Sequence, residues 1–197
     1  MNQRAMRPLT VVAAFLASLA VGLALTVWLL GGPRAALAPA AIGGPFQLVD
    51  QTGQTVTERN LQGKPTLVFF GFTHCPDVCP TTLFEISELL SGMGKDADRV
   101  NAYFVSVDPE RDGADVMKDY LSSFDPHLKG LTGDSAAVAK MISAYRVYAK
   151  KIPLKDGDYT MDHTALVYLM DRDGRFVAPF NLKRRPEDAA AELKRYL

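Results

Sequence analysis

The first feature of the hydrophobic pattern is an uncharged run at residues 9–30, LTVVAAFLASLAVGLALTVWLL. At a rise of about 1.5 Å per residue, a helix of this length would cross a hydrocarbon core of about 30 Å. No polar face interrupts the run, which argues against a buried core helix. Arg4 and Arg7 precede it, and no acidic residue occurs before Asp50. The positive-inside rule therefore predicts a cytoplasmic N-terminus at residues 1–8 and a single-pass transmembrane anchor.

A cleaved signal peptide is the alternative to this anchor. The segment Ala36-Leu37-Ala38 fits the A-x-A pattern at which such peptides are cut. The apolar core of a signal peptide usually has about 7–15 residues, and the longer run in this chain favours the uncleaved anchor. Residues 31–44, GGPRAALAPAAIGG, are small and show no periodicity, so they predict a tether.

Beyond the tether, residues 45–197 show the pattern of a folded domain. Two continuous apolar runs, 66–72 and 101–108, predict strands buried on both faces. Apolar residues recur at helical spacing within 81–93, so the first of these strands leads into a helix through the loop 71–80. The pattern also predicts short strands at 46–50 and 55–57, helices at 114–124 and 134–145, a hairpin of strands 164–170 and 175–180, and a closing helix at 186–197.

The order of these elements predicts an α/β fold. A strand–helix–strand start followed by an antiparallel hairpin and a helix gives a mixed sheet flanked by helices, which is the pattern of thioredoxin-like domains. Residues 149–161, AKKIPLKDGDYTM, are polar, and we expect a long mobile excursion. Its lysines Lys150, Lys151 and Lys155 are expected to be solvated, with docking to a partner as the alternative. In open α/β sheets the site lies beyond the carboxyl ends of the strands, which here is the loop 71–80.

The charge of the chain argues against a nucleic-acid partner. Three of the 22 basic residues, Arg4, Arg7 and Arg34, lie in the first 40 positions, where there is no acid. The remainder carries 19 basic against 22 acidic residues, a net charge of −3. Such a balance lacks the basic surface that nucleic-acid binding needs. The domain is long enough to bury a core without disulfides.

Both cysteines lie in the loop GFTHCPDVCP, residues 71–80. If Cys79 lies in the first turn of the helix and Cys75 just before it, the offset of four brings both sulfurs to one side. A helix N-terminus favours thiolates, and a Cα separation of about 6 Å suits a disulfide. The pair can therefore form a disulfide or hold a soft metal. A purely structural disulfide would stabilise little, because the loop it closes is short.

A metal site needs more than two sulfurs, and the histidines are the candidates. His163 precedes the strand 164–170, where it could swing toward the cysteine loop or be structural. His74 is expected to be solvated or to tune the site, and His127 to lie in a surface loop. Two thiolates and one imidazole suit Cu(I), with Cu(II) accessible, whereas zinc would want a fourth ligand.

Three stretches carry a resemblance to a known family. They are "GFTHCPDVCPTTL" (71–83), "VSVDPERD" (105–112) and "DYTMDHTALVYLMDRDGRF" (158–176), and together with the N-terminal anchor they resemble the Sco/SenC family of copper-binding, membrane-anchored assembly proteins. The resemblance covers nearly the whole soluble part and implies a thioredoxin-like fold.

The same resemblance implies a ligand set. Cys75, Cys79 and His163 would ligate copper, one ion per chain, with a Cys75–Cys79 disulfide as the oxidised form. Asp77, between the cysteines, is expected to support the ligands from outside the coordination sphere. Asp162 is less suited to orient His163, because adjacent strand residues point to opposite faces.

The resemblance also implies a function, partners and a location. The chain would be a copper metallochaperone for the dinuclear copper centre of cytochrome c oxidase subunit II. Its partners would be that subunit and other periplasmic copper chaperones. Residues 1–8 lack the composition of a mitochondrial transit peptide, so we expect a bacterial inner membrane with the domain in the periplasm. Ligand exchange needs no turnover, so we do not expect an enzyme.

Two other functions remain open from the sequence. The first is a thiol–disulfide reductase acting on the cysteines of that oxidase subunit, for which His163 would be dispensable. The second is a peroxidase, because Val78 to Thr81 read V-C-P-T as in peroxiredoxins. Peroxiredoxins also need a threonine three residues before the cysteine, and here that position is Pro76, which argues against the second.

Overall fold

The computed structural model describes residues 6–30, 41–155 and 157–197. The long helix α1 (Met6–Leu30) includes a segment, Thr10–Trp28, that is long and apolar enough to cross a membrane, as the sequence predicted. Length and composition support this assignment, and a signal sequence would meet the same criteria. The Ala36-Leu37-Ala38 segment and most of the predicted tether lie outside the described residues.

A second compact unit comprises Ala41–Leu197. Its centre is a mixed sheet in the order β2-β1-β5-β4-β3-β8-β9. The central strands β3, β4 and β5 are parallel, whereas β8 pairs with β3 antiparallel. The strands are β1 (Gln47–Asp50), β2 (Thr55–Thr57), β3 (Thr66–Gly71), β4 (Asn101–Ser106), β5 (Leu128–Thr132), β8 (Val167–Met170) and β9 (Phe176–Pro179).

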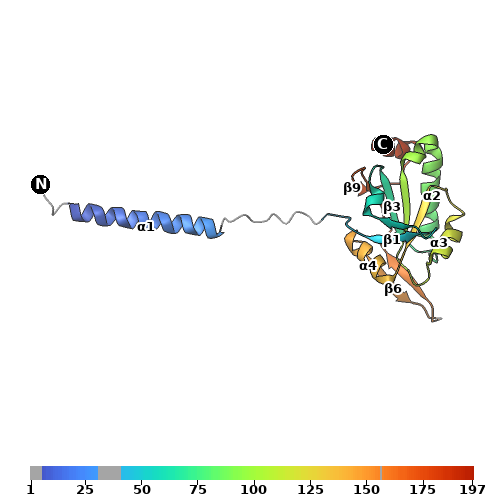
Figure 1. The fold of residues 1–197 in the computed structure, drawn as a ribbon, viewed down its shortest axis with the longest axis horizontal. Coiled ribbons are helices and arrows are strands. Elements are labelled where there is room, and N and C mark those ends of the chain that lie inside the picture. Colours follow the sequence, from blue (N-terminus) through green and yellow to red (C-terminus); the bar gives the residue numbers. More distant parts are fainter. Residues whose placement is uncertain (1–5, 31–40, 156) are drawn as a thin grey trace. The chain divides into compact units, whose positions relative to one another are not determined.

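Helices cover both faces of this sheet (Figure 1). They are α2 (Val78–Met93), α3 (Ala114–Leu121), α4 (Ser135–Ala144) and α5 (Pro186–Lys194), with short 3-10 turns at η1 (Glu58–Leu61) and η2 (Gly94–Arg99). Phe69 stacks on Phe104, whose ring contacts Tyr120 of α3. The opposite pleat presents Phe70 to Tyr145, the residue that ends α4. The sheet is therefore buried on both sides, and the α/β class with flanking helices is confirmed.

Three local predictions need correction. The segment 149–161 is no mobile excursion, because β6 (Ala149–Pro153) and β7 (Tyr159–His163) form a separate antiparallel ribbon, drawn in orange beside α4 in Figure 1. The strand predicted at 164–170 begins only at Val167. The strand β5 was missed, because Gly130 interrupts its apolar pattern; a Cβ there would lie 2.8 Å from Leu121 and Met117 side-chain atoms.

The start of the folded unit lies slightly before residue 45. The amide of Gly43 donates to the carbonyl of Ala144 at the end of α4, with a distance of 2.9 Å. Ile42 packs against the core with a partly buried side chain. Residues 42–44 are therefore fastened to the domain.

Gly71 allows α2 to pass close to the end of β3. A Cβ at this position would lie 2.7 Å from Cys79 Sγ and 2.7 Å from Phe104 Cε2. Real Cβ atoms essentially never come this close to other heavy atoms, so the absent side chain is required for the buried position of Cys79. The glycine that ends β3 thereby fixes where one of the two sulfurs lies.

We predict that Gly71→Ala lowers the free energy of unfolding by about 1–3 kcal/mol, because the added methyl group overpacks the core. Gly92→Ala is the matched control, because Gly92 lies in α2 with nothing within 4 Å of its would-be Cβ. Alanine there should raise the free energy of unfolding by up to about 1 kcal/mol. Urea unfolding of the reduced protein measures both, and equal effects would contradict the close approach at Gly71.

Candidate metal centre

The two cysteines lie where the loop after β3 enters α2. The helix begins at Val78, so Cys79 is in its first turn and Cys75 precedes it, as predicted. The amide of Cys79 donates to Cys75 Sγ at 3.4 Å, and both cysteines are free thiols. Cys79 is fully buried, whereas Cys75 keeps 9% of its surface exposed. Cys75 is therefore the less buried of the two cysteines.

His163 reaches the cysteines from the ribbon. It is the last residue of β7, and its Nε2 atom lies 3.6 Å from Cys79 Sγ. Among the described residues, one group of cysteine, histidine and acidic side chains has the geometry of a possible metal site, namely Cys75, Cys79 and His163, with ligand atoms within 4.8 Å of one another. The structure thus brings together the three residues that the sequence singled out.

The contacts of His163 define which ring nitrogen is available. Nδ1 lies 3.2 Å from the carbonyl oxygen of Thr164, which can only accept, so Nδ1 carries the proton. Nε2 is then left with its lone pair directed at Cys79 Sγ. Phe72 packs against the imidazole edge to face at 5.7 Å between ring centroids. Burial lowers the pKa of His163, which favours the neutral form that binds metals.

The electrostatic environment of Cys79 differs from the sequence-based expectation. Burial raises the pKa of the Cys79 thiol, and the neighbouring Cys75 raises it further, although a backbone hydrogen bond at Phe72 acts in the other direction. The position at a helix N-terminus was expected to favour the thiolate, whereas burial of Cys79 acts in the opposite direction in the metal-free protein. A metal would have to displace the proton on binding.

The accessory residues named from the sequence lie outside this cluster. Asp77 is exposed at the N-cap of α2 and makes no capping hydrogen bond through its side chain. Asp162 is also exposed and lies opposite Lys150 in the ribbon. His74 is exposed, with Nδ1 3.1 Å from Thr73 Oγ1. None of these contacts connects a side chain to the three candidate ligands.

His127 is remote from the cluster but is more than a free surface residue. Its Nδ1 lies 2.6 Å from Asp125 and its Nε2 3.1 Å from Asp98, across the start of β5. These two carboxylates raise the pKa of His127 above its usual value. His127 therefore has a structural role, in which it contacts these two carboxylates.

A buried carboxylate that the sequence did not single out holds the cysteine loop. Asp112 is fully buried and accepts hydrogen bonds from the Thr73 amide at 3.1 Å and from the Thr73 hydroxyl at 2.6 Å. The Ser106 hydroxyl also donates to it, at 2.7 Å. Burial raises the pKa of Asp112, whereas these three donors favour its ionised form. Asp112 is the last residue of "VSVDPERD" (105–112), one of the stretches that carried the family resemblance. The sequence alone assigned no role to the acidic residues of that stretch.

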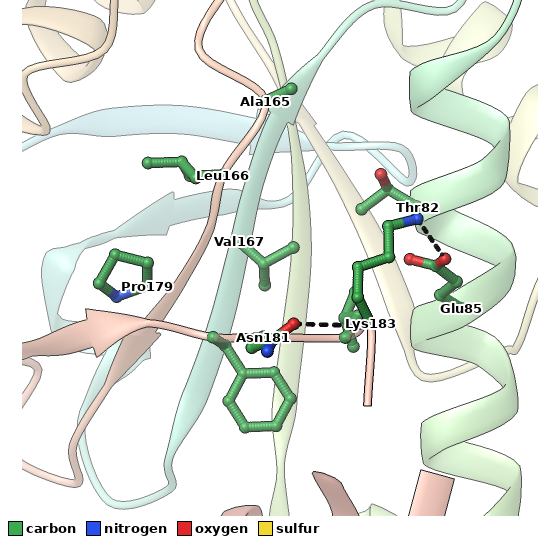
Figure 2. A pocket seen from close by; sticks show the side chains of 10 residues that line it. Thr82, Glu85, Ala165, Leu166, Val167, Pro179, Asn181 and Lys183 are labelled. Carbon is green, nitrogen blue, oxygen red and sulfur yellow. Dashed lines mark hydrogen bonds and ion pairs between the residues drawn. The ribbon is translucent and has the colours of Figure 1, made fainter. Parts of the chain in front are cut away.

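Figure 2 shows a cavity of about 300 Å³ whose lining residues include sequence neighbours of the candidate ligands. Its walls include Thr82 on α2, one turn after Cys79, and Ala165 and Leu166, which directly follow His163 and Thr164. Lys183 pairs with Glu85 at its rim, with a distance of 2.7 Å. No cysteine or histidine lines this cavity, so it is not part of the candidate metal centre.

Comparisons with known proteins show the family to which the chain is similar. A family model described as SCO1/SenC matches residues 34–197. The mitochondrial SCO1 homolog 1 of Arabidopsis thaliana is 43% identical over 147 residues, which are 74% of this chain and 43% of the plant protein. The chain spans about half the length of the first curated relatives that it matches.

Solved structures with copper bound are similar in sequence and in fold. ScoI of Bradyrhizobium japonicum with copper bound is 76% identical, with a TM-score of 0.78, over 80% of this chain and 100% of that one. ScoI of Arabidopsis thaliana with copper bound is 38% identical, with a TM-score of 0.71, over 78% and 97% of the two chains. The thioredoxin-like fold expected from the order of elements is confirmed.

We predict that Asp112→Asn lowers the free energy of unfolding by about 1–3 kcal/mol, because an amide nitrogen would face the donors of Thr73 or Ser106. Hydrogen exchange at the Thr73 amide should accelerate in the same variant. Asp119→Asn is the control, because Asp119 is exposed on the adjacent helix α3 and its substitution should change stability by less than about 0.5 kcal/mol. Urea unfolding and exchange measured by NMR provide both readouts. Unchanged exchange at Thr73 would show that Asp112 does not hold the loop.

Proposed function

Because this chain belongs to the SCO1/SenC family, we propose that it binds one copper ion through Cys75, Cys79 and His163 and carries it for the assembly of cytochrome c oxidase. The observation that supports this most directly is the cluster of two sulfurs and one imidazole nitrogen within 4.8 Å of one another. Metal–ligand bonds of about 2.0–2.3 Å can bridge the 3.6 Å between Cys79 Sγ and His163 Nε2.

The chemistry of the donor set fits copper. Thiolates and imidazole are soft or intermediate ligands, and three of them form a low-coordinate site that suits Cu(I) and leaves Cu(II) accessible. Copper in such a site is a soft Lewis acid that can pass to another protein by exchange of ligands. Zinc in a structural site would need a fourth protein ligand, and among the described residues the cluster offers three.

Each protein ligand has a distinct part in loading and release. Cys79 is buried and must lose its proton as the ion enters. Cys75 keeps some exposed surface and is the ligand that an incoming thiolate or imidazole of a partner would meet first. His163 is favoured in its neutral form with the proton on Nδ1, so its Nε2 atom can bind the ion without losing a proton. We place its withdrawal at the step that opens the site for transfer.

The location and partners follow from the family and from α1. The helix would anchor the chain in a bacterial inner membrane, with the domain in the periplasm. The acceptor would be subunit II of cytochrome c oxidase, and other periplasmic copper chaperones would supply the ion. Val78 and Leu166 next to the ligands expose apolar side chains, as expected of a surface that another protein covers for a time.

A thiol–disulfide reductase acting on the same oxidase subunit is the second candidate. The unequal burial of the two cysteines favours it, because Cys75 is 9% exposed and Cys79 is fully buried, and ordered exchange needs one more accessible cysteine. The Cys75 thiolate would attack the acceptor disulfide and release one acceptor thiolate. The Cys79 thiolate would then attack the mixed disulfide, leaving a Cys75–Cys79 disulfide and a reduced acceptor. His163 would have no part in these steps.

We predict that the reduced domain binds one Cu(I) or one Cu(II) per chain. Replacing His163 by alanine should weaken Cu(II) binding by more than about tenfold, because even the outer partners of metal ligands contribute about 10–100-fold to affinity. His74→Ala is the matched control, since His74 is next to Cys75 but exposed, and it should bind copper as the wild type does. Competition titrations with a chromophoric chelator measure these affinities. Equal Cu(II) affinity of His163→Ala and wild type would remove His163 from the site.

The two candidate functions predict different outcomes of a transfer experiment. We expect the copper-loaded domain to pass its ion to the metal-free, already reduced copper domain of oxidase subunit II, as followed by the absorption of the dinuclear centre. A thiol–disulfide reductase would instead reduce the oxidised acceptor without copper and would be unaffected by His163→Ala. The reductase would be favoured if copper-free His163→Ala reduced the acceptor and the copper-loaded wild type transferred no copper to it.

A further inference from the structure

The ribbon that carries His163 needs an external attachment to hold its position. It consists of β6 and β7 alone, and most of its side chains are exposed or only half-buried. An isolated two-stranded ribbon is at best marginally stable in water. A cavity of about 510 Å³ lies between the ribbon, α4 and residues 107–110, with Met161 of β7 among its lining residues. Apolar packing beneath the ribbon is therefore incomplete.

A compact set of contacts attaches the ribbon to the segment after β4. Arg111 donates through Nε to Asp108 Oδ2 at 2.5 Å and through Nη1 to the carbonyl oxygen of Tyr159 at 2.9 Å. The Tyr159 hydroxyl donates to the other Asp108 oxygen at 2.9 Å. The Arg111 guanidinium also lies over the Tyr159 ring, with 3.7 Å between Cζ and the ring centroid. We call Asp108, Arg111 and Tyr159 the clasp.

The clasp is shielded from water and has supporting contacts. The side chains of Asp108 and Arg111 are 2% and 16% exposed, so their ion pair is much less screened than a surface pair. Lys151 of β6 lies over the same Tyr159 ring at 4.0 Å and pairs with Glu110 at 2.7 Å. Lys151 is thus exposed, as the sequence predicted, and also contacts the clasp.

The clasp also contacts residues that pack against His163 or hold the cysteine loop. Arg111 Cζ lies 5.9 Å from the centroid of Phe72, whose ring packs edge to face against His163. The Ser106 hydroxyl accepts from the Asp108 amide at 2.9 Å and donates to Asp112, which holds Thr73 of the cysteine loop. The short segment 106–112 therefore contacts both the loop that carries the cysteines and the strand that carries His163.

We propose that Arg111 is a positioning residue for His163, and that the clasp keeps β7 in the place where the imidazole faces the two sulfurs. Arg111 touches neither sulfur nor imidazole and acts through the Tyr159 end of β7 and through Phe72. Opening of the clasp would release the Tyr159 end of β7 and so loosen the strand that carries His163. This inference rests on the proposed function where it concerns copper, whereas its structural part holds for the metal-free protein.

The test compares Arg111→Met with two milder variants and one control. Methionine keeps an apolar stem and removes the guanidinium, Arg111→Lys keeps only the charge, and Tyr159→Phe removes only the bond to Asp108. Arg111 pairs with two aspartates, Asp108 and, at 3.3 Å, Asp158. Arg175→Met is the matched control, because Arg175 also pairs with two aspartates, Asp171 and Asp173, but in the exposed turn before β9. Circular dichroism and thermal unfolding establish that each variant is folded. If Arg111→Met does not fold, Arg111→Lys and Tyr159→Phe are used to test the proposal.

In the metal-free protein, we expect amide hydrogen exchange in β7 to accelerate by about tenfold in Arg111→Met, as the loss of hydrogen bonds to a charged group implies. The His163 ring-proton resonances should move toward random-coil values as contact with Phe72 is lost. Arg111→Lys and Tyr159→Phe should give intermediate shifts, and Arg175→Met none. Wild-type exchange and resonances in all the clasp variants that fold would overturn the proposal.

Copper loading separates positioning from a merely structural role. Arg111→Met should still bind one Cu(I), because the two sulfurs remain, but its Cu(II) complex should lose the nitrogen hyperfine splitting of an imidazole in the electron paramagnetic resonance spectrum. An unchanged splitting together with a loosened β7 would overturn the role of Arg111 in positioning His163. If the wild type binds no copper, the proposed function fails, and the metal-free measurements still decide whether Arg111 positions the imidazole.

Discussion

The buried carboxylate of Asp112 is the contact on which the geometry of the cysteine loop depends. It accepts the amide and hydroxyl of Thr73 and the hydroxyl of Ser106, so it joins the start of the loop to the end of β4 inside the core. A buried carboxylate is costly unless it is fully hydrogen-bonded, and these donors offset that cost. The same segment carries Asp108 and Arg111. One short stretch of chain therefore contacts both the cysteine loop and the ribbon that carries His163.

Burial shapes the chemistry of the candidate ligands in opposite ways. It raises the pKa of Cys79 and lowers the pKa of His163, so in the metal-free protein both groups are favoured in their neutral forms. A soft cation can replace the thiol proton without leaving an unpaired charge in the core. The ligands also differ in setting, because the cysteines belong to the β3–α2 connection in the core and His163 belongs to a separate two-stranded ribbon with no fully buried side chain. Elements that move in function come from such less stable regions.

The sequence predicted those parts of the fold whose apolar pattern is strong. The buried strands at 66–72 and 101–108 and the helix around Leu83 were found because long apolar or amphipathic runs have one clear period. β5 was missed because Gly130 leaves room for Met117, which breaks its pattern. The ribbon β6–β7 was read as a mobile excursion because it buries no continuous face, so its lysines and Pro153 give no strand signal. Arg111, which is distant in sequence, attaches it to the segment after β4.

The sequence by itself determined the candidate ligands, the α/β class and the apolar N-terminal helix. The spacing of Cys75 and Cys79 places two sulfurs at the start of a helix, and this local relation follows from helix geometry alone. Only the tertiary structure decided that His163, 84 residues after Cys79, presents Nε2 to the sulfur, with its proton on Nδ1. It also decided that the Cys79 thiol is buried and that Arg111 attaches the ribbon. These features depend on contacts between segments far apart in the chain, where desolvation and neighbouring groups set protonation and position, and no local pattern encodes them.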